Sequence, residues 1–330
     1  MLEHGGRLRQ AVLDYGIAEA DWVDLSTGIA PWAFPIPDIA PRAWARLPEN
    51  DDGLEDAARG YYGFQHVLPV PGSQAAIQTL PRLRRSGRVG VLSPCYAEHA
   101  EGWRQAGHVV REINEEEVEH FIDSLDVLVV VNPNNPTGRL LSTERLLAWN
   151  ARLNCRGGWL VVDEAFMDNT PQGSLARHGV QSGLIVLRSF GKFFGLAGVR
   201  LGFVLGEPRL LRSLADLIGP WAVSGPTRRL GQACLLDEAA QRAQIARCAQ
   251  ASERLARCLQ HHGLAPQGGC ALFQSVSCAQ AEHLQGFLAQ RGILVRLFKQ
   301  DCRLRFGLPA DEGDWARLDA ALSDYREHLA

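Results

Sequence analysis

The sequence predicts an α/β fold, with a mostly parallel central sheet in a large domain and a smaller α+β domain. Unbroken apolar runs of four or five residues, such as Val127–Val131 and Leu184–Leu187, are typical of parallel strands that are buried on both faces. A chain of 330 residues is long enough for one large and one smaller domain. We expect the large domain at residues 40–220, and an N-terminal arm and small domain at residues 1–39 and 221–330.

The hydrophobic pattern predicts the remaining elements. Leu54, Ala57, Ala58 and Tyr61 recur at the i, i+3, i+4 and i+7 positions of an amphipathic helix. Helix-breaking residues are nearly absent between Arg228 and His262, which predicts one long helix. Val23–Pro31 is expected to be a short strand-like piece that ends in a proline-rich turn. The other expected strands are Val89–Leu92, Val127–Val131, Trp159–Val162, Leu184–Leu187, Leu201–Leu205, Ala271–Val276, Gly292–Phe298 and Arg303–Gly307. The expected helices are Leu54–Tyr62, Ala75–Leu80, Pro208–Ile218, Arg228–His262, Gln280–Gln290 and one from about Asp314.

Composition excludes several classes of function. The chain is 46% hydrophobic and 22% charged with a net charge of −3, so we expect no nucleic-acid partner. No apolar run approaches the roughly 20 residues of a membrane span, and we expect no secretory signal. The eight cysteines form no C-x-x-C pair, so we expect no metal site and a reducing, cytoplasmic location.

Lys192 lies in a glycine-rich stretch, Ser189–Gly202, with the pattern S-x-x-K-x-x-G-L-A-G-x-R-x-G. A lysine among apolar side chains is easily desolvated, and its neutral amine can condense with the aldehyde of pyridoxal phosphate. Arg200 can supply a cation for the phosphate of that cofactor, and Ser189 can supply a hydroxyl. The alternative is a glycine-rich turn with a surface lysine.

A second anion site is expected where Pro71–Gln74 precedes a helical stretch. Gly72 and Ser73 then lie at a helix N-terminus, where free N–H groups and the helix dipole favour an anion. An ordinary serine N-cap is the alternative, and the two interpretations are compatible.

Polar residues follow three of the expected strands. Asp163 lies 28 residues after Asn135 and 29 before Lys192, and each gap has room for one helix and one strand. Because ligands of open α/β sheets bind outside the carboxyl ends of the strands, we expect these three residues at adjacent strand ends. Asn132 and Asn134 are expected to hold the loop itself, and Glu164 is expected to be structural.

Together these motifs resemble the histidinol-phosphate aminotransferase-like branch of the fold-type I pyridoxal phosphate enzymes. The resemblance implies pyridoxal 5′-phosphate as cofactor, with Lys192, Asp163 and Tyr96 as catalytic residues. Asp163 would pair with the ring nitrogen and Tyr96 would lie on the ring. The implied cofactor contacts are Gly72, Ser73, Gln74, Tyr96, Asn135, Asp163, Ser189, Lys192 and Arg200. Many members of the branch have a tyrosine at the position of Phe166. The family usually has a tyrosine at the position of Leu47 as well, so this sequence differs from the family pattern at both positions.

The pairing of H-G-G-R at His4 with D-L-S-x-x-I-x-P at Asp24 resembles one subfamily in particular, the L-threonine-O-3-phosphate decarboxylases of cobalamin biosynthesis. A flexible terminus is the alternative for the first motif. The resemblance implies a small phosphorylated amino acid as substrate and a homodimer. The implied substrate contacts are His4, Gly5, Gly28, Asn135, Arg296 and Arg303. Arg305 lies on the same strand face as Arg303, so the choice between them stays open.

The motifs do not decide which bond of the substrate breaks. Loss of the carboxylate makes the protein a decarboxylase of L-threonine O-3-phosphate, which gives (R)-1-amino-2-propanol O-2-phosphate. Loss of the α-proton makes it an aminotransferase that uses 2-oxoglutarate. A third possibility is a catalytically silent protein that keeps the fold.

Overall fold

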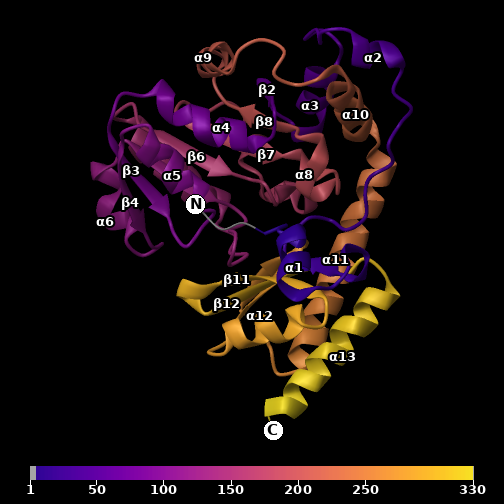
Figure 1. Cartoon of the computed structure of the whole chain (residues 1–330). Coiled ribbons are helices and arrows are strands. Elements are labelled where there is room, and N and C mark those ends of the chain that lie inside the picture. The colour runs from indigo at the N-terminus through magenta and orange to yellow at the C-terminus, as the bar shows by residue number, and fades with distance from the viewer. Residues whose placement is uncertain (1–4, 330) are drawn as a thin grey trace. The chain divides into compact units, whose positions relative to one another are not determined.

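The computed structural model describes residues 5–329, and its internal contacts divide the chain into two compact units (Figure 1). The large unit comprises Phe34–Asn135 and Leu140–Ala243. The small unit comprises the described residues up to Ala33, Pro136–Arg139 and the chain from Gln244 onward. The domain boundaries expected from the sequence, near residues 40 and 220, stay a prediction.

The large unit is built on a seven-stranded sheet with the order β2-β8-β7-β6-β5-β3-β4. Its strands are β2 (Val67–Val70), β3 (Arg88–Leu92), β4 (Val109–Ile113), β5 (Val127–Val131), β6 (Trp159–Asp163), β7 (Leu184–Ser189) and β8 (Gly202–Leu205). The strands from β4 to β7 are parallel, and β8 runs antiparallel to β7 and β2. The predicted α/β class with a mostly parallel sheet is therefore confirmed.

Helices complete the large unit. They are α2 (Pro41–Ala45), α3 (Leu54–Tyr62), α4 (Ser73–Thr79), α5 (Glu98–Gln105), α6 (Val118–Phe121), α7 (Thr143–Asn154), α8 (Phe190–Phe193), α9 (Pro208–Ile218) and α10 (Gly225–Leu236). Short 3-10 turns are η2 (Leu80–Leu83), η3 (Ile122–Ser124), η4 (Met167–Asn169), η5 (Pro171–Gly173), η6 (Leu175–His178) and η7 (Ala197–Val199). Helix α3 has the predicted bounds, although Tyr62 rather than Tyr61 is its buried aromatic residue.

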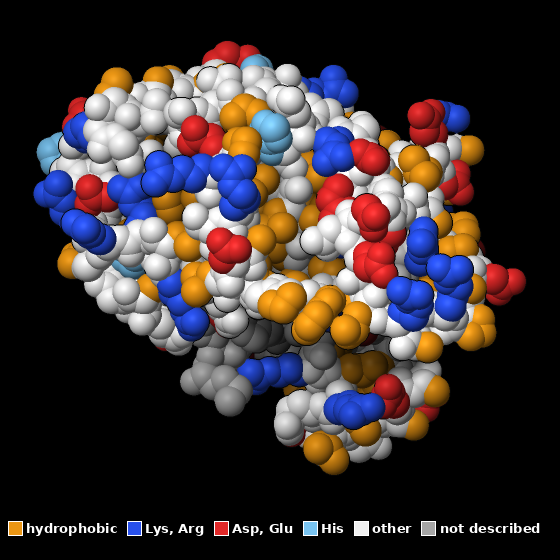
Figure 2. All heavy atoms as spheres, turned by 90° about the horizontal axis from the view of Figure 1, so that it is seen from above, with side chains coloured by type: hydrophobic (Ala, Val, Ile, Leu, Met, Phe, Trp, Pro, Cys, Tyr) orange, Lys and Arg blue, Asp and Glu red, His pale blue; other side chains and the backbone are white. Residues whose placement is uncertain are grey.

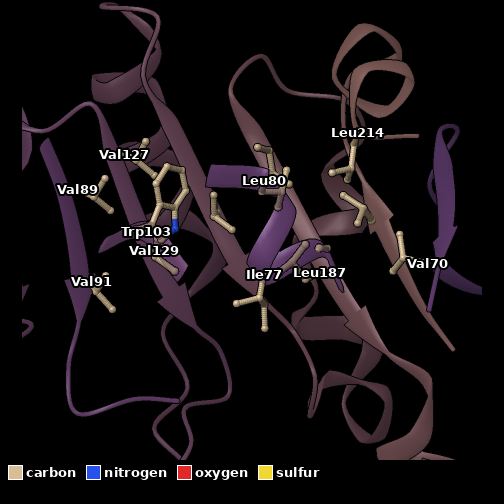
Figure 3. Close-up of a cluster of buried hydrophobic side chains, with 14 of the residues drawn as sticks. Val70, Ile77, Leu80, Val89, Val91, Trp103, Val127, Val129, Leu187 and Leu214 are labelled. Atoms are coloured by element: carbon tan, nitrogen blue, oxygen red, sulfur yellow. The ribbon is translucent and has the colours of Figure 1, made fainter. Parts of the chain in front are cut away.

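One apolar cluster joins helices to this sheet (Figure 3). Val89 on β3 and Val127 on β5 are fully buried, and Ile77 of α4 and Trp103 of α5 pack in the same cluster. Burial of each such side chain contributes about 1.5–3 kcal/mol, so the β-branched residues of the central strands both form the strands and anchor the helices.

The single long helix predicted for Arg228–His262 is wrong. The chain leaves helical geometry at Asp237 (φ −87°, ψ 77°), which separates α10 from α11 (Glu238–His261). The side-chain Oδ1 of Asp237 accepts a hydrogen bond from Ala240 N (2.9 Å), so this residue starts the second helix instead of continuing the first.

The small unit has a five-stranded sheet with the order β1-β11-β12-β10-β9. Its strands are β1 (Val23–Leu25), β9 (Gly268–Cys270), β10 (Phe273–Ser277), β11 (Ile293–Phe298) and β12 (Arg303–Gly307). Only β1 pairs in parallel, with β11. The other elements are α1 (Leu8–Tyr15), η1 (Glu19–Asp21), α12 (Ala281–Ala289), η8 (Lys299–Asp301), α13 (Glu312–Leu329) and α11 from Gln244.

Charged side chains of both signs are interspersed with apolar ones on the face shown in Figure 2, in line with the small net charge. Among the described residues, no helix combines the length and the apolar character needed to cross a membrane.

Candidate active site

The candidate site starts at the carboxyl ends of three neighbouring parallel strands, β5, β6 and β7. Their register pairs Val131 with Asp163, and Asp163 with Leu187. The backbone continues this pairing past the strands, because Asn132 N donates to Asp163 O (2.9 Å). The expectation that Asn135, Asp163 and Lys192 follow adjacent strands is confirmed.

The loop after β5 is fixed by asparagine side chains. Asn132 exchanges two hydrogen bonds with the backbone of Leu141, at 2.8 and 3.3 Å. Asn134 Nδ2 donates to Pro94 O (3.1 Å). Both residues hold the loop as predicted. The neighbouring Asn135 is half-buried.

Asp163 has a partner that sequence reasoning missed. Its Oδ2 lies 2.9 Å from Nε2 of His99 on α5, and its Oδ1 accepts a hydrogen bond from Ala165 N (3.0 Å). Asp163 is 3% exposed and His99 is 1% exposed, so water does not compete for this contact. The imidazole therefore fixes the direction of the carboxylate. The only sequence signal was a histidine three residues after Tyr96.

Tyr96 is held by a chain of side-chain hydrogen bonds. Its hydroxyl donates to Gln74 Oε1 (3.0 Å), and Gln74 Nε2 donates to Glu98 Oε2 (2.8 Å). Burial, followed by the charges of Glu98 and Asp163, raises the pKa of Tyr96 to about 12. The hydroxyl is thus a proton donor at neutral pH. Both the oxygen and the nitrogen of the Gln74 side-chain amide form hydrogen bonds in this chain. The Gln74 side chain therefore orients Tyr96, and its backbone N–H is a separate group.

The start of α4 forms a small cradle beside an arginine. Gly72 precedes the helix with φ +76°, and a Cβ built there would lie 2.8 Å from Nη2 of Arg200. A Cβ on Gly202 would lie 2.5 Å from Ser73 N. Gly72 takes the N-cap position and Ser73 is the first helical residue, so the ordinary serine N-cap is not observed. Free N–H groups and a guanidinium together favour an anion.

Lys192 lies on α8, which directly follows Ser189 at the end of β7. Its side chain is half-buried, and Nζ lies 5.6 Å from the ring centroid of the buried Phe166. The whole sequence contains only one other lysine, Lys299. That residue is exposed in the small unit and pairs with Glu282 (2.6 Å).

A buried ion-pair cluster supports the segment after β6. Arg188 contacts Glu164 at 2.7 Å and Asp168 at 2.6 Å, and all three side chains are at most 2% exposed. Ser174 Oγ also donates to Glu164 (2.5 Å). Glu164 is therefore structural, as predicted.

In the small unit, the two N-terminal motifs contact each other. Gly6 N donates to Ser26 Oγ (2.8 Å), and a Cβ on Gly5 would clash with Ser26 O. Asp24 Oδ1 in turn accepts from Ser26 N (2.9 Å) and Oγ (2.6 Å). Gly5 and Gly6 are thus tied to the end of β1 rather than loose, while His4 lies outside the described residues.

Three arginines share one face of the small sheet, where Arg296 is directly opposite Arg305. Arg305 is 5% exposed and donates to Ser26 O (2.6 Å). Burial, aided by the charge of Arg296, lowers its pKa to about 10 against the opposing effect of Cys270. Arg303 is half-buried, and its Nη1 donates to Ser275 Oγ (3.0 Å).

Gly28 follows β1 with φ +61°, a conformation that glycine adopts without strain. Its buried backbone is all that it offers to a ligand.

A sequence model of aminotransferase class I and II matches residues 41–317. The chain belongs to this family. Within it, the chain is 64% identical to a threonine-phosphate decarboxylase of Pseudomonas aeruginosa, over 99% of both chains. It is 43% identical to a threonine-phosphate decarboxylase of a Sinorhizobium species, over 97% of both chains.

Solved structures show the same family fold. The histidinol-phosphate aminotransferase of Sinorhizobium meliloti in complex with pyridoxal-5′-phosphate has a TM-score of 0.84 at 21% identity, covering 100% of this chain and 96% of that chain. The L-threonine-O-3-phosphate decarboxylase of Porphyromonas gingivalis has a TM-score of 0.75 at 20% identity, covering 92% and 99%. The predicted fold-type I architecture is confirmed.

Proposed function

We propose that this protein is a pyridoxal phosphate-dependent decarboxylase that converts L-threonine O-3-phosphate into (R)-1-amino-2-propanol O-2-phosphate. The observation that carries the proposal is the 64% identity, over nearly the full chain, to a protein named threonine-phosphate decarboxylase. The product is the linker of the cobalamin nucleotide loop, as the subfamily resemblance implies.

The residues of the large unit fit pyridoxal 5′-phosphate. The absence of a Cβ at Gly72 lets the Arg200 guanidinium approach the start of α4 closely, and a guanidinium beside helix N–H groups favours a phosphate. We infer that Gly72, Ser73 and Arg200 bind the phosphate. We infer the same role for the Ser189 hydroxyl and for the backbone of Gln74. Asn135 would bind the phenolic oxygen, Asp163 the ring nitrogen, Tyr96 the ring face and Lys192 the aldehyde carbon.

When bound, the cofactor supplies an aldehyde for amines and a ring that accepts the electron pair left by departing carbon dioxide. Asp163, oriented by His99, keeps a proton on the ring nitrogen. The Cα–carboxylate bond breaks, carbon dioxide leaves, and Lys192 Nζ or a water delivers one proton to Cα. Phe166, buried close to Lys192, adds no proton donor to this step.

For the substrate, we propose that Arg303 binds the α-carboxylate and Arg296 the phosphate. A guanidinium matches a carboxylate or phosphate with two parallel hydrogen bonds. Arg303 is favoured over Arg305, because Arg305 is buried and donates to a backbone carbonyl. We propose that Gly5 and Gly28 contribute backbone groups, and the same role for His4 stays a prediction.

We also propose a homodimer. Six large apolar side chains of the large unit are exposed by more than half, and contact with a second copy would cover apolar surface of this kind. They are Ile36, Trp44, Leu47, Val109, Trp221 and Leu236. Light scattering of the purified protein should give twice the chain mass, and a monomer at working concentration would exclude this assembly. The eight free cysteines support the proposal of a cytoplasmic location.

The deciding experiment is incubation with L-threonine O-3-phosphate, with carbon dioxide measured in parallel with amino transfer to 2-oxoglutarate. We expect carbon dioxide in a one-to-one ratio with the aminopropanol phosphate, and no glutamate. Glutamate without carbon dioxide would identify an aminotransferase. Neither product, together with no visible cofactor absorbance, would identify a silent protein.

A further inference from the structure

Three side chains with metal-binding chemistry meet between α11 and α13 of the small unit. Both helices are labelled in Figure 1. They are Cys258 of α11, His262 directly after that helix, and Asp319 of α13. One ligand atom from each, a sulfur, a ring nitrogen and a carboxylate oxygen, lies within 4.8 Å of the other two. None of these residues belongs to the proposed reaction site.

The backbone brings the first two residues to one helix face. His262 N donates to Cys258 O (3.3 Å), so His262 extends the last turn of α11 and lies one turn after Cys258. Asp319 reaches both from the facing helix. Its Oδ1 lies 2.8 Å from His262 Nε2 and 3.7 Å from Cys258 Sγ.

The cluster is closed on the protein side and open on the solvent side. The His262 side chain is 3% exposed, whereas the Asp319 side chain is 63% exposed. Among the described residues, the buried Nδ1 of His262 has no hydrogen-bond partner. The ring is therefore held through Nε2 alone. Because a carboxylate only accepts, Nε2 carries the proton in this contact, and that proton has to move to Nδ1 before Nε2 can bind a metal.

We propose that Cys258, His262 and Asp319 bind a zinc ion or a similar divalent transition metal, with water as the fourth ligand. Thiolate, imidazole and carboxylate are the three ligand types that zinc takes in proteins. The zinc ion exchanges waters for the sulfur, the Nε2 nitrogen and a carboxylate oxygen. As these bonds form, the Cys258 thiol gives up its proton to the solvent, the His262 ring proton moves from Nε2 to Nδ1, and the His262–Asp319 hydrogen bond is lost.

Metal binding requires some movement of the three ligands, of which the sulfur and the ring nitrogen lie within 4.8 Å of each other. Zinc–ligand bonds of the usual lengths in a tetrahedral arrangement separate sulfur from oxygen by about 3.6 Å and nitrogen from oxygen by about 3.4 Å. The sulfur–oxygen distance of 3.7 Å already fits. The nitrogen–oxygen distance of 2.8 Å has to widen, and the exposed Asp319 is the residue that is free to move.

A metal at this point would link α11 to α13. These helices are also joined by the Arg254–Glu312 pair, at 2.5 and 2.7 Å, and by the stacking of the Arg254 guanidinium on the Trp315 ring, at 4.3 Å. A ligand that binds only the folded chain raises its stability by mass action. We therefore expect zinc to raise the melting temperature of the protein while its decarboxylase activity stays the same.

The test uses the holoenzyme after removal of metals with a chelator. Zinc is titrated against a chromogenic chelator, and cobalt(II) is added separately to report the ligand type by its visible spectrum. We expect one zinc per chain and a tetrahedral cobalt spectrum with a thiolate ligand. Asp319→Asn, which keeps an oxygen for His262, and Cys258→Ser should each weaken zinc binding by more than about tenfold. Cys278→Ser, a half-buried cysteine of the same unit, is the matched control.

Three results would overturn the proposal, and the first two concern the unmutated protein. The first is a holoenzyme that retains no zinc against the competing chelator. The second is a cobalt spectrum of the unmutated protein without thiolate character, which decides the question even if a variant does not fold. The third is equal zinc affinity in Asp319→Asn, Cys258→Ser and the control, which would place any bound metal elsewhere.

Discussion

Replacing His99 by leucine removes the side chain that faces Asp163 inside the large unit. The two groups lie 2.9 Å apart and are 1% and 3% exposed, so no water can take the place of the imidazole. A hydrogen bond to a charged group contributes about 1.5–3 kcal/mol. Each factor of ten in rate corresponds to about 1.4 kcal/mol. If the whole contribution serves to orient the carboxylate for the reaction, its loss should therefore slow decarboxylation by about 10- to 150-fold.

The assay is carbon dioxide release from L-threonine O-3-phosphate at saturating cofactor, with kcat and KM separated. We expect the loss in kcat, because His99 contacts Asp163 and not the proposed substrate residues. The control is His99→Gln, which keeps an N–H donor at similar reach and should recover most of the rate. An unchanged kcat in His99→Leu, or an equal loss in both variants, would refute a positioning role for the imidazole.

Three further predictions follow from the large unit. Gln74→Ala removes the acceptor of the Tyr96 hydroxyl and should weaken cofactor binding by about 3- to 10-fold, measured by fluorescence titration; unchanged affinity would show that this hydrogen bond does not matter for binding. Phe166→Tyr adds a hydroxyl near Lys192 and should lower the midpoint pH of the cofactor's absorbance titration. An unchanged midpoint would contradict an effect of residue 166 on this titration. Burial raises the pKa of Asp52, but the hydrogen bonds and charge that it receives, chiefly from Arg228, outweigh burial and lower that pKa overall. The Asp52–Arg228 pair therefore stabilises the fold at neutral pH and loses its effect as pH falls through the lowered pKa. Arg228→Met should cost about 3–5 kcal/mol in urea unfolding at neutral pH and less in acid, and a pH-independent loss would contradict this.

The central strands could be predicted because burial on both faces leaves them uniformly apolar. The two strands that sequence reasoning missed in the large unit, β2 and β4, are the edges of the sheet. Strand β2 contains Pro69, and β4 (Val109–Ile113) has exposed and charged positions, so neither shows the pattern of a central strand. In the small unit, β9 (Gly268–Cys270) is too short and glycine-rich to be recognised.

The candidate site could be predicted where a motif sets several residue types at fixed spacing, as around Lys192 and Asn135. It could not be predicted where a contact arises only from packing. His99 is an ordinary helix residue until α5 brings it to Asp163, and the two positions are 64 residues apart. In the same way, composition gave no sign that Asp237 would end one helix and start another.

The most direct test of the account is to fix the cofactor to its lysine with sodium borohydride and to locate the added mass by peptide mapping. The chain is favourable for this, since Lys192 has only Lys299 as a competitor. The account predicts the label on Lys192 alone, and its loss in Lys192→Ala. A label on Lys299, or none in a protein that releases carbon dioxide from the substrate, would contradict it.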